Sequence, residues 1–233
     1  FPLLREMSMP ATIYLVSDMI GTCSLFWPER LSGMLADLES RYGTGWHDLP
    51  ATAWLKRYTS CLKENTCVAD RETLTGIINS VKSLPDLAIH DHIDTTTEAL
   101  GLEDGTQQTT SLLDWEQIRT MLESGLIEVG SHTRRHTRLN ADIPAKLMHE
   151  EIILSQMTIE QKSGRKAKTF CFPNGDYTPA ALDLVRQYYD GAVTTRSGWN
   201  TVNSDRHQLS RIGVHNDITH DRIAFLARIS GWL

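Results

Sequence analysis

Two histidines four residues apart are the sharpest chemical feature of this sequence. They are His132 and His136, within the run Gly-Ser-His-Thr-Arg-Arg-His at 130–136. If the run is helical, both imidazole rings lie on one face and can reach one cation at about 2.0–2.1 Å, the distance typical of zinc–nitrogen bonds. Histidines at this spacing also occur by chance on solvated surfaces, so the pair alone leaves both interpretations open.

A second feature is the segment 169–177, Thr-Phe-Cys-Phe-Pro-Asn-Gly-Asp-Tyr, which we interpret as a strand running into a Pro-Asn-Gly turn. Such a turn directs backbone N–H groups outward at the end of a strand, where they could stabilise an oxyanion. A plain connection between a strand and a helix would have the same character. The functional interpretation of this turn is favoured because the turn follows the histidine pair along the chain.

A third group of candidate ligands, His90, His92 and Asp94, lies far from any predicted strand. Parallel α/β folds build their sites at the carboxyl ends of strands. Because no strand end positions this third group, we expect a solvated loop here rather than a metal site.

Five short apolar segments predict the strands that position these features. They cover residues 10–17, 126–131, 168–173, 191–195 and 209–214. The first has the character of a fully buried parallel strand. Helical patterns lie between them, over 141–164 with a stop at Gly164, over 114–125 with Asp114 as N-cap, and from 178–179 onward. The alternation predicts an α/β fold with a parallel sheet, in which both chemical features follow strands.

Residues 26–112 interrupt this alternation. Helical stretches are predicted over 28–41, 51–64 and 71–81, and polar runs at 95–97 and 105–110 read as loops. Nothing in this part has the pattern of a strand, so we interpret it as an α-helical insertion within one domain covering 1–233. The insertion could cover the site or form a dimer contact, which leaves a homo-oligomer open.

The composition is that of a globular protein. The chain has 233 residues, of which 40% are apolar and 22% charged. A chain of this length buries about 70% of its unfolded surface, so its core needs no structural metal. The four cysteines, Cys23, Cys61, Cys67 and Cys171, are too scattered for a disulfide framework, and we expect buried or half-buried free thiols. Cys61 and Cys67 could still pair if a turn brings them together.

Charge and hydropathy argue against two classes of partner. The net charge of −6 offers no basic excess for a phosphate backbone, so a nucleic-acid partner is not expected. No apolar run approaches the roughly 20 residues of a membrane span. No signal peptide is visible, which slightly favours the cytoplasm. The chain begins at Phe1 as if within an element, so we expect further residues upstream.

Several segments together resemble the polysaccharide deacetylase domain, also called the NodB-homology domain or carbohydrate esterase family 4. The matching segments are 130–139, Glu150, Glu151 and Ser155 on the next helix, 170–175 and 191–195. Residues 9–15 resemble that family's second strand, which follows its first catalytic motif. The resemblance covers residues 1 to about 25 and 112–233. It implies a distorted (β/α) barrel and the metal-dependent removal of an N-acetyl or O-acetyl group from a carbohydrate substrate.

The resemblance also implies roles for single residues. His132 and His136 would be ligands of a divalent metal, zinc being the expected ion, which polarises the acetyl carbonyl and activates water. The backbone amide of Asn174 would stabilise the oxyanion, and Thr133 would support the ligand loop through hydrogen bonds. His215, near the last strand, would be the general acid, although a solvated loop histidine fits the sequence as well.

Two further residues are candidates for substrate binding. Trp199 follows Ser-Gly near the predicted catalytic face and could stack on a sugar ring, although most tryptophans pack in cores. Arg211, on the last predicted strand, could orient an acidic partner or bind substrate, or it could form a structural salt bridge.

The sequence departs from the family pattern in two places. The family's first motif, of the Thr-Phe-Asp-Asp-Gly kind, supplies the catalytic base and a third metal ligand, and it is absent here. Upstream residues, a lost activity or a substitute carboxylate such as Asp18 would each account for that. Cys171 stands where many members have arginine, which we take as a subfamily trait.

We therefore expect a metal-dependent hydrolase that deacetylates a sugar or polysaccharide. The alternative is a catalytically inactive carbohydrate-binding protein on the same fold. A metal-dependent amidohydrolase acting on a non-sugar C–N bond would use the same residues. An Asp-Asp pair in the upstream codons would favour an enzyme over a binding protein.

Overall fold

The computed structural model describes residues 1–59, 70–103, 112–215 and 218–231. The chain divides into two compact units, one formed by Phe1–Gly21 with Leu113–Leu233 and the other by Thr22–Leu112. The backbone N–H of Gly21 donates to the carbonyl oxygen of Leu113 at 2.9 Å. The chain therefore leaves the first unit and re-enters it at adjacent points.

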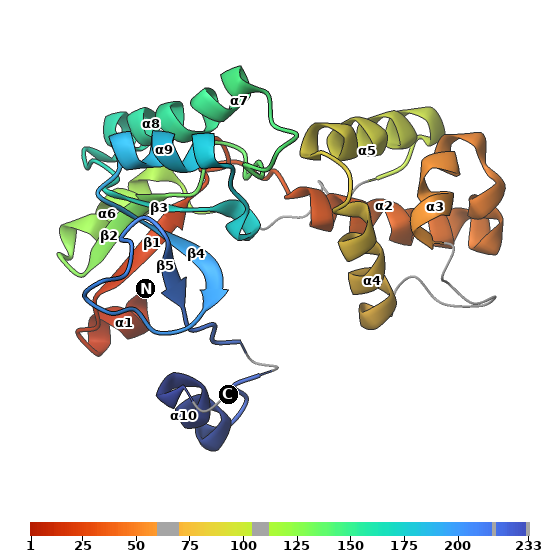
Figure 1. Cartoon of the computed structure of the whole chain (residues 1–233). Helices are drawn as coiled ribbons and strands as arrows, with labels where there is room; N and C mark the ends of the chain where they lie inside the picture. Colours follow the sequence, from red (N-terminus) through yellow and green to blue (C-terminus); the bar gives the residue numbers. More distant parts are fainter. Residues whose placement is uncertain (60–69, 104–111, 216–217, 232–233) are drawn as a thin grey trace. The chain divides into compact units, whose positions relative to one another are not determined.

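The first unit contains a five-stranded sheet whose strands follow one another in chain order (Figure 1). The strands are β1 (Ala11–Leu15), β2 (Ile127–Ser131), β3 (Thr169–Cys171), β4 (Gly191–Ser197) and β5 (Leu209–Arg211). Every neighbouring pair is parallel. The predicted α/β fold with a parallel sheet is confirmed, and each predicted strand segment contains or overlaps one of these strands.

Helices and helical turns precede, connect or follow the strands of this unit, and within the described ranges β4 and β5 are joined without a helix. They are α1 (Pro2–Glu6), α6 (Trp115–Glu123), α7 (Ala145–His149), the π-helical turn η3 (Glu150–Leu154), α8 (Ser155–Ser163), the 3-10 turn η4 (Pro173–Gly175), α9 (Pro179–Tyr188) and α10 (Arg222–Ser230). Asp114 caps α6 by accepting from the Gln117 N–H, and Gly164 ends α8 in the left-handed conformation. Both helix ends confirm the sequence prediction.

The predicted helix over 141–164 starts later than expected. It begins at Ala145, because Pro144 restrains the residue before it to extended conformations. Helix α7, the turn η3 and helix α8 then continue one another without a break to Gly164. The π-helical turn places Glu151 in the interior, with 1% of its surface exposed.

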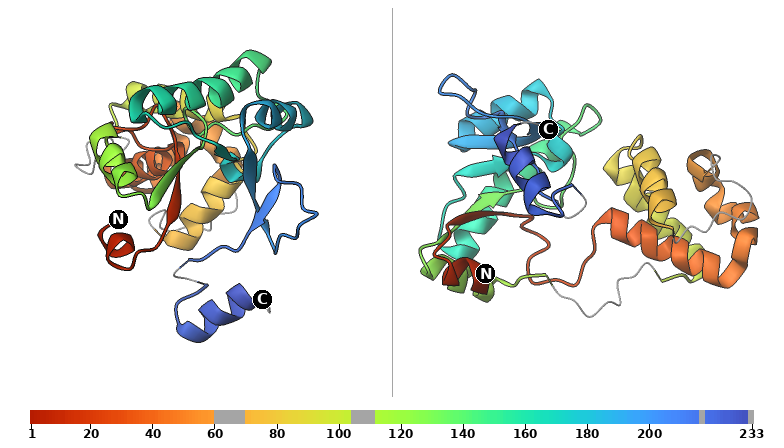
Figure 2. Two further views of the ribbon diagram at one scale, coloured as in Figure 1. Left: turned by 90° about the vertical axis from the view of Figure 1, so that its left-hand side faces the viewer. Right: turned by 90° about the horizontal axis from the view of Figure 1, so that it is seen from below.

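The hydrophobic core of the first unit lies between the sheet and helices α6, α8 and α9. Alternate strand residues such as Val129 and Phe170 pack against Ile118 of α6, Ile159 of α8 and Val185 of α9. Figures 1 and 2 show α8 and α9 side by side over the strands. This continuous apolar layer holds the strands in place on the helices, and with them the edge of the sheet at which the strands end.

Strand β1 corrects one expectation. Only Leu15 of this strand is buried, and the other residues are half-buried or exposed, so it is not the fully buried strand that its composition predicts. The reason is its place in the sheet: within the described part of the chain β1 comes first in the strand order and pairs with β2. A strand with one neighbour exposes more of its surface than a central strand.

The described residues of the second unit are mainly helical, as predicted, but the sequence pattern did not reveal all of the helices. Its helices are α2 (Trp27–Tyr42), η1 (Gly43–Asp48), η2 (Pro50–Leu55), α3 (Lys56–Thr59), α4 (Arg71–Val81) and α5 (Asp86–Leu100). Helix α5 includes His90, His92 and the threonines at 95–97, so the expected solvated loop is wrong. Ile89 and Ile93 are fully buried on one face of α5, and their packing outweighs the low helix propensity of threonine.

Two of the four cysteines lie in the described ranges. Both are free thiols, as expected, but only Cys171 is buried; Cys23 is exposed, so the burial expected for it is wrong. Cys61 and Cys67 lie outside the described residues. Among the helices of the described ranges, none combines the length and apolar character needed to cross a bilayer.

Candidate active site

The two histidines come together in a loop rather than on a helix, which corrects the geometry expected from their spacing. His132 follows β2 directly, and both Thr133 and His136 adopt a left-handed backbone conformation with φ of 66°. The ring centroids of His132 and His136 nevertheless lie 4.8 Å apart, at an interplanar angle of 72°. The loop therefore pairs the imidazoles through its irregular backbone.

The tautomer of His132 follows from one hydrogen bond. Its Nδ1 lies 2.7 Å from the backbone carbonyl oxygen of Cys171 on β3. A carbonyl oxygen only accepts, so Nδ1 carries the hydrogen and Nε2 keeps its lone pair. Burial, together with the nearby His136, lowers the pKa of His132 to about 4. Near neutral pH this imidazole is uncharged, which is the form that binds a metal.

The chain just after β1 holds the histidine loop from one side. The backbone N–H of His132 donates to the carbonyl of Leu15 at 2.9 Å. The N–H groups of Ser17 and Asp18 donate to the carbonyls of Thr133 and Arg134 at 3.2 and 2.9 Å. The ends of β1 and β2 are therefore joined beyond the last ladder residues.

Asp18, the candidate substitute carboxylate, is engaged by arginines of the same loop. Its Oδ2 lies 2.8 Å from Nη2 of Arg134 and 3.3 Å from Nε of Arg135, and its Oδ1 accepts from Nε of Arg134 at 3.2 Å. Both carboxylate oxygens thus already have cationic partners. To bind a metal, Asp18 would have to exchange these partners for the cation.

Thr133 makes the supporting contacts of the loop. It is fully buried, its hydroxyl donates to the carbonyl of His132 at 2.5 Å, and its own carbonyl accepts from the Ser155 hydroxyl at 3.0 Å. Glu151, one helical turn before Ser155, accepts from two backbone amides of the loop. No role for Glu151 followed from the sequence, although the segment containing it was part of the family resemblance.

The Pro-Asn-Gly turn lies at the same end of the sheet, directly after β3. Asn174 has a left-handed φ of 54°, and its carbonyl accepts from the Thr195 hydroxyl at 2.9 Å. The amides of Gly175 and Asp176 donate to the carbonyls of Phe172 and Pro173. Because these two amides already donate to carbonyls, the backbone amide of Asn174 is the one in this turn that we consider as a donor to an oxyanion.

The remaining candidate residues follow β4 and β5. Arg211 ends β5, its Nε donates to the carbonyl of Thr194 at 2.7 Å, and its charge contributes to the low pKa of His132. His215 is exposed on the segment beyond β5. Trp199 lies in the β4–β5 connection with 65% of its surface exposed, so it is not a core residue.

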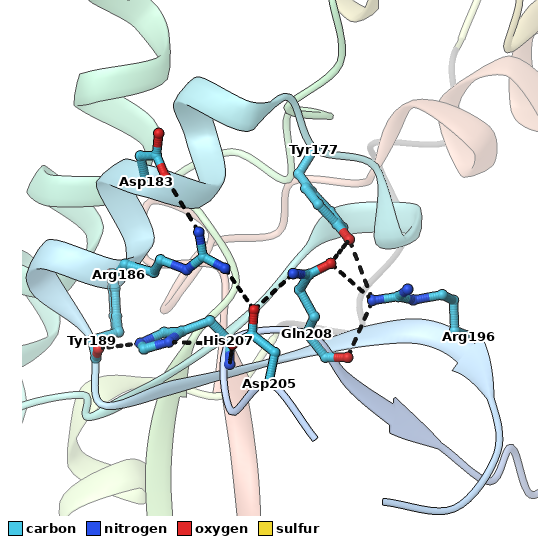
Figure 3. A network of polar contacts seen from close by, with 8 residues as sticks. All are labelled: Tyr177, Asp183, Arg186, Tyr189, Arg196, Asp205, His207 and Gln208. Atoms are coloured by element: carbon cyan, nitrogen blue, oxygen red, sulfur yellow. Dashed lines mark hydrogen bonds and ion pairs between the residues drawn. The ribbon is translucent and has the colours of Figure 1, made fainter. Parts of the chain in front are cut away.

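A polar network anchors the connection that carries Trp199 (Figure 3). Asp205 accepts from Arg186 of α9 at 2.6 Å and from the Gln208 side chain at 2.7 Å. The buried His207 lies with Nε2 2.9 Å from the carbonyl oxygen of Tyr189. The end of the connection that precedes β5 is thereby tied to α9 and to the residue that follows it.

The comparison with protein families decides which family this architecture represents. The polysaccharide deacetylase model matches residues 1–189, which include the histidine loop, η3 and the Pro-Asn-Gly turn. The chain belongs to the polysaccharide deacetylase family. The comparison with curated proteins gives no match.

Solved deacetylase structures are among those similar to this polysaccharide deacetylase. One from Bacillus cereus is 21% identical with a TM-score of 0.47, over 60% of this chain and 47% of that chain. IcaB from Ammonifex degensii is 22% identical with a TM-score of 0.42, over 61% and 69%. A Streptococcus pyogenes deacetylase in complex with acetate is 15% identical with a TM-score of 0.44, over 82% of both chains. The chain thus spans about half the length of the Bacillus cereus relative.

The side chains of this family member fit part of a metal site. The His132–His136 pair offers two nitrogen donors, one with its tautomer fixed by a backbone carbonyl, as metal-binding histidines have. Within the ranges that the structure describes, no group of three or more His, Cys, Asp or Glu side chains could hold a metal ion, and this applies to His90 and His92 as well. The described residues therefore supply two of the ligands that a metal site needs.

Proposed function

We propose that this chain is a metal-dependent hydrolase that removes acetyl groups from an N-acetylated sugar or polysaccharide. The observation that supports it best is the pairing of His132 and His136 at the carboxyl end of β2, with His132 uncharged near neutral pH. Five parallel strands in chain order fit the distorted (β/α) barrel of this family, with residues 26–112 inserted into it.

His132 and His136 would hold a divalent metal, with zinc as the expected ion. When bound, such a metal polarises an acetyl carbonyl and lowers the pKa of a bound water. The Asn174 amide would donate to the oxygen that gains negative charge when water attacks the carbonyl carbon. His215 would give a proton to the leaving amine, and Trp199 and Arg211 would contact the sugar.

The chain's own geometry prepares these roles. The Cys171 carbonyl keeps Nδ1 of His132 protonated, which leaves the lone pair on Nε2 for a metal. The Thr195 hydroxyl holds the Asn174 carbonyl, which fixes the orientation of the turn. Arg211 adds positive charge near His132.

A second candidate function is carbohydrate binding without catalysis. It is favoured by the donor count, because the described part of the chain supplies two imidazoles but no cluster of three metal-binding groups. Asp18, the carboxylate considered as a substitute, is already paired with Arg134 and Arg135.

Metal content and acetate release distinguish the two functions. The whole chain, loaded with Zn²⁺, is incubated with N-acetylglucosamine oligomers, and released acetate is measured beside the bound zinc. For the hydrolase we expect acetate release and about one zinc per chain, both lost in His132→Ala and His136→Ala. The exposed His149 on α7 provides the matched control, since His149→Ala should keep both properties. Full acetate release by both site variants would contradict the proposal, and sugar binding without release would support the second function.

A further inference from the structure

A buried carboxylate lies beneath the histidine loop. Glu151 is 1% exposed, and its Oε2 accepts the backbone N–H groups of Arg134 and Arg135 at 2.8 and 3.0 Å. The Thr137 side chain also hydrogen-bonds to this carboxylate. Three donors thus converge on one acidic group, and all come from the loop that carries the two histidines.

Burying a carboxylate is costly unless hydrogen bonds or ion pairs compensate its charge. Burial raises the pKa of Glu151, which shows that the surroundings disfavour the charged form, while the loop amides counteract this effect. A buried ionised group that is fully hydrogen-bonded adds little net stability compared with a well-packed apolar side chain. Its value lies in specifying which backbone conformation the loop adopts.

The loop conformation needs such support because it is strained. Thr133 and His136 both have φ of 66°, a region that side chains with a Cβ rarely adopt, β-branched ones least of all. Arg134 and Arg135, whose amides bind Glu151, lie between these two residues. Their hydrogen bonds therefore act on the segment whose relaxation would separate the imidazole rings.

A second contact from the same helix face supports the loop. Ser155, four residues after Glu151, donates to the Thr133 carbonyl at 3.0 Å, and its hydroxyl lies 2.7 Å from that of Ser131 on β2. Glu151 thus binds two backbone amides of the loop, and Ser155 binds the backbone carbonyl of Thr133. The π-helical turn η3, which contains Glu151, is of the kind often found beside functional sites.

We propose that Glu151 is a positioning residue of this site, whose carboxylate holds the 133–136 backbone so that His132 and His136 face each other. The pairing itself is a property of the metal-free chain. Its consequence for metal binding rests on the proposed function.

Three variants of the whole chain test this role. Glu151→Leu removes every acceptor while keeping the side-chain volume. Glu151→Gln keeps one neutral oxygen, whose hydrogen bonds are weaker than those of a carboxylate. Glu150→Gln is the matched control, because the side chain of the adjacent Glu150 is 36% exposed and forms a long ion pair with the exposed Lys146, at 4.0 Å.

The first measurement is made without metal. NMR of the wild-type chain should show a nuclear Overhauser contact between the two imidazole rings, and slow exchange of the Arg134 and Arg135 amides. In Glu151→Leu the ring contact should disappear, and in Glu151→Gln both amides should exchange about tenfold faster, the loss expected when a charge-assisted hydrogen bond becomes a neutral one. An intact ring contact in folded Glu151→Leu would overturn the proposal. If that variant does not fold, unchanged amide exchange in Glu151→Gln would overturn it.

The second measurement is the affinity for Zn²⁺ alone, by competition with a chromophoric chelator. We expect about a tenfold or greater loss in folded Glu151→Leu, a smaller loss in Glu151→Gln, and the wild-type value in Glu150→Gln. Absence of zinc binding by the wild-type chain would refute the metal-dependent function, while the metal-free measurement would still decide the role of Glu151. If the wild-type chain binds zinc, an unchanged zinc affinity in both folded Glu151 variants would overturn that role.

Discussion

The Nδ1 atom of His132 donates to the backbone carbonyl of Cys171 across 2.7 Å, which joins the ends of β2 and β3. Because the acceptor belongs to the backbone, this bond does not depend on which side chain occupies position 171. The cysteine that replaces the arginine of many family members therefore leaves the tautomer of His132 unchanged. Burial and the nearby His136 lower the pKa of this imidazole, and the bond to Cys171 partly opposes them.

Burial of His132 should make the metal-free chain less stable in acid. Its pKa is about 4 in the folded chain and near 6.5 in the unfolded chain, so the unfolded state takes up a proton first as the pH falls. Stability is complete above about pH 6.5 and declines toward pH 4, by up to about 3 kcal/mol. Urea unfolding in the presence of a chelator, at neutral pH and at about pH 4.5, measures this loss of stability.

The variant His132→Asn isolates the contribution of this imidazole. It should lose less stability than the wild type between the two pH values, since asparagine does not titrate. The exposed His149 again serves as control, because His149→Asn should follow the wild-type curve. An equal loss in His132→Asn and wild type would assign the acid sensitivity to other groups.

Gly175 is the residue of the Pro-Asn-Gly turn least able to accept a side chain. Its φ is +79°, and a Cβ at this position would overlap the Thr195 hydroxyl, the group that holds the Asn174 carbonyl. We expect Gly175→Ala to destabilise the chain by about 2 kcal/mol or more and to displace the turn. Thermal unfolding and acetate release measure the two effects.

The variant Gly164→Ala is the control that separates the strain of a left-handed backbone from the overlap with Thr195. It has a similar φ of +73°, but a Cβ added there would meet no heavy atom within 4 Å. Gly164→Ala should cost only about 1 kcal/mol, the usual penalty for a left-handed alanine, and should leave acetate release intact. Similar losses of stability in both variants would show that the contact with Thr195 is unimportant.

The sequence predicts best what depends on neighbouring residues. Asp114 caps α6 as expected, because a short polar side chain bonds the backbone three residues on wherever the helix is placed. Helix α5 was missed although Ile89 and Ile93, four residues apart, have the spacing of apolar residues on one face of a helix. The threonines that follow them obscured it.

The histidine loop illustrates what local reasoning does not reach. A spacing of four suggests a helix, but the loop is shaped by Glu151, whose partners Arg134 and Arg135 lie 17 and 16 residues away, and by the chain after β1. The family resemblance identified His132 and His136 as a pair. The backbone geometry that pairs them follows from contacts distant in sequence.

Asp205 should stabilise the β4–β5 connection. It accepts from the His207 amide, from Gln208 and from Arg186, which lowers its pKa to about 2. Because 35% of its side chain is exposed, solvent screens these interactions, and we expect Asp205→Asn to cost only about 1 kcal/mol near neutral pH. Denaturant unfolding measures the loss.

The pH dependence gives this prediction its sign. The folded-state pKa of Asp205 lies below the unfolded value of 3.8, so its stabilisation is present above that value and disappears as the pH falls toward 2. The difference between Asp205→Asn and wild type should therefore shrink in acid. Asp183 contacts the same Arg186 at 3.3 Å but is 66% exposed, and Asp183→Asn should change stability by less than about 0.5 kcal/mol. A larger effect of Asp183→Asn would place the anchor of the connection elsewhere.

Arg211 should act on the site through its charge. Its guanidinium group is among the causes that lower the pKa of His132, and it also lowers those of the Cys171 thiol and the Tyr14 hydroxyl, which burial raises. Removal of a positive charge favours the protonated form of every neighbouring group. In Arg211→Met, which keeps the apolar stem, the pKa of all three groups should therefore rise.

NMR titration of His132 in the metal-free chain measures the shift caused by Arg211→Met. The matched control is Arg196→Met, since Arg196 on β4 bonds instead to Tyr177 and Gln208. A rise in the pKa of His132 in Arg211→Met alone would mean that the charge of Arg211 adds to the lowering caused by burial and by His136. An unchanged titration curve, or equal shifts in both variants, would restrict Arg211 to its hydrogen bond with the Thr194 carbonyl.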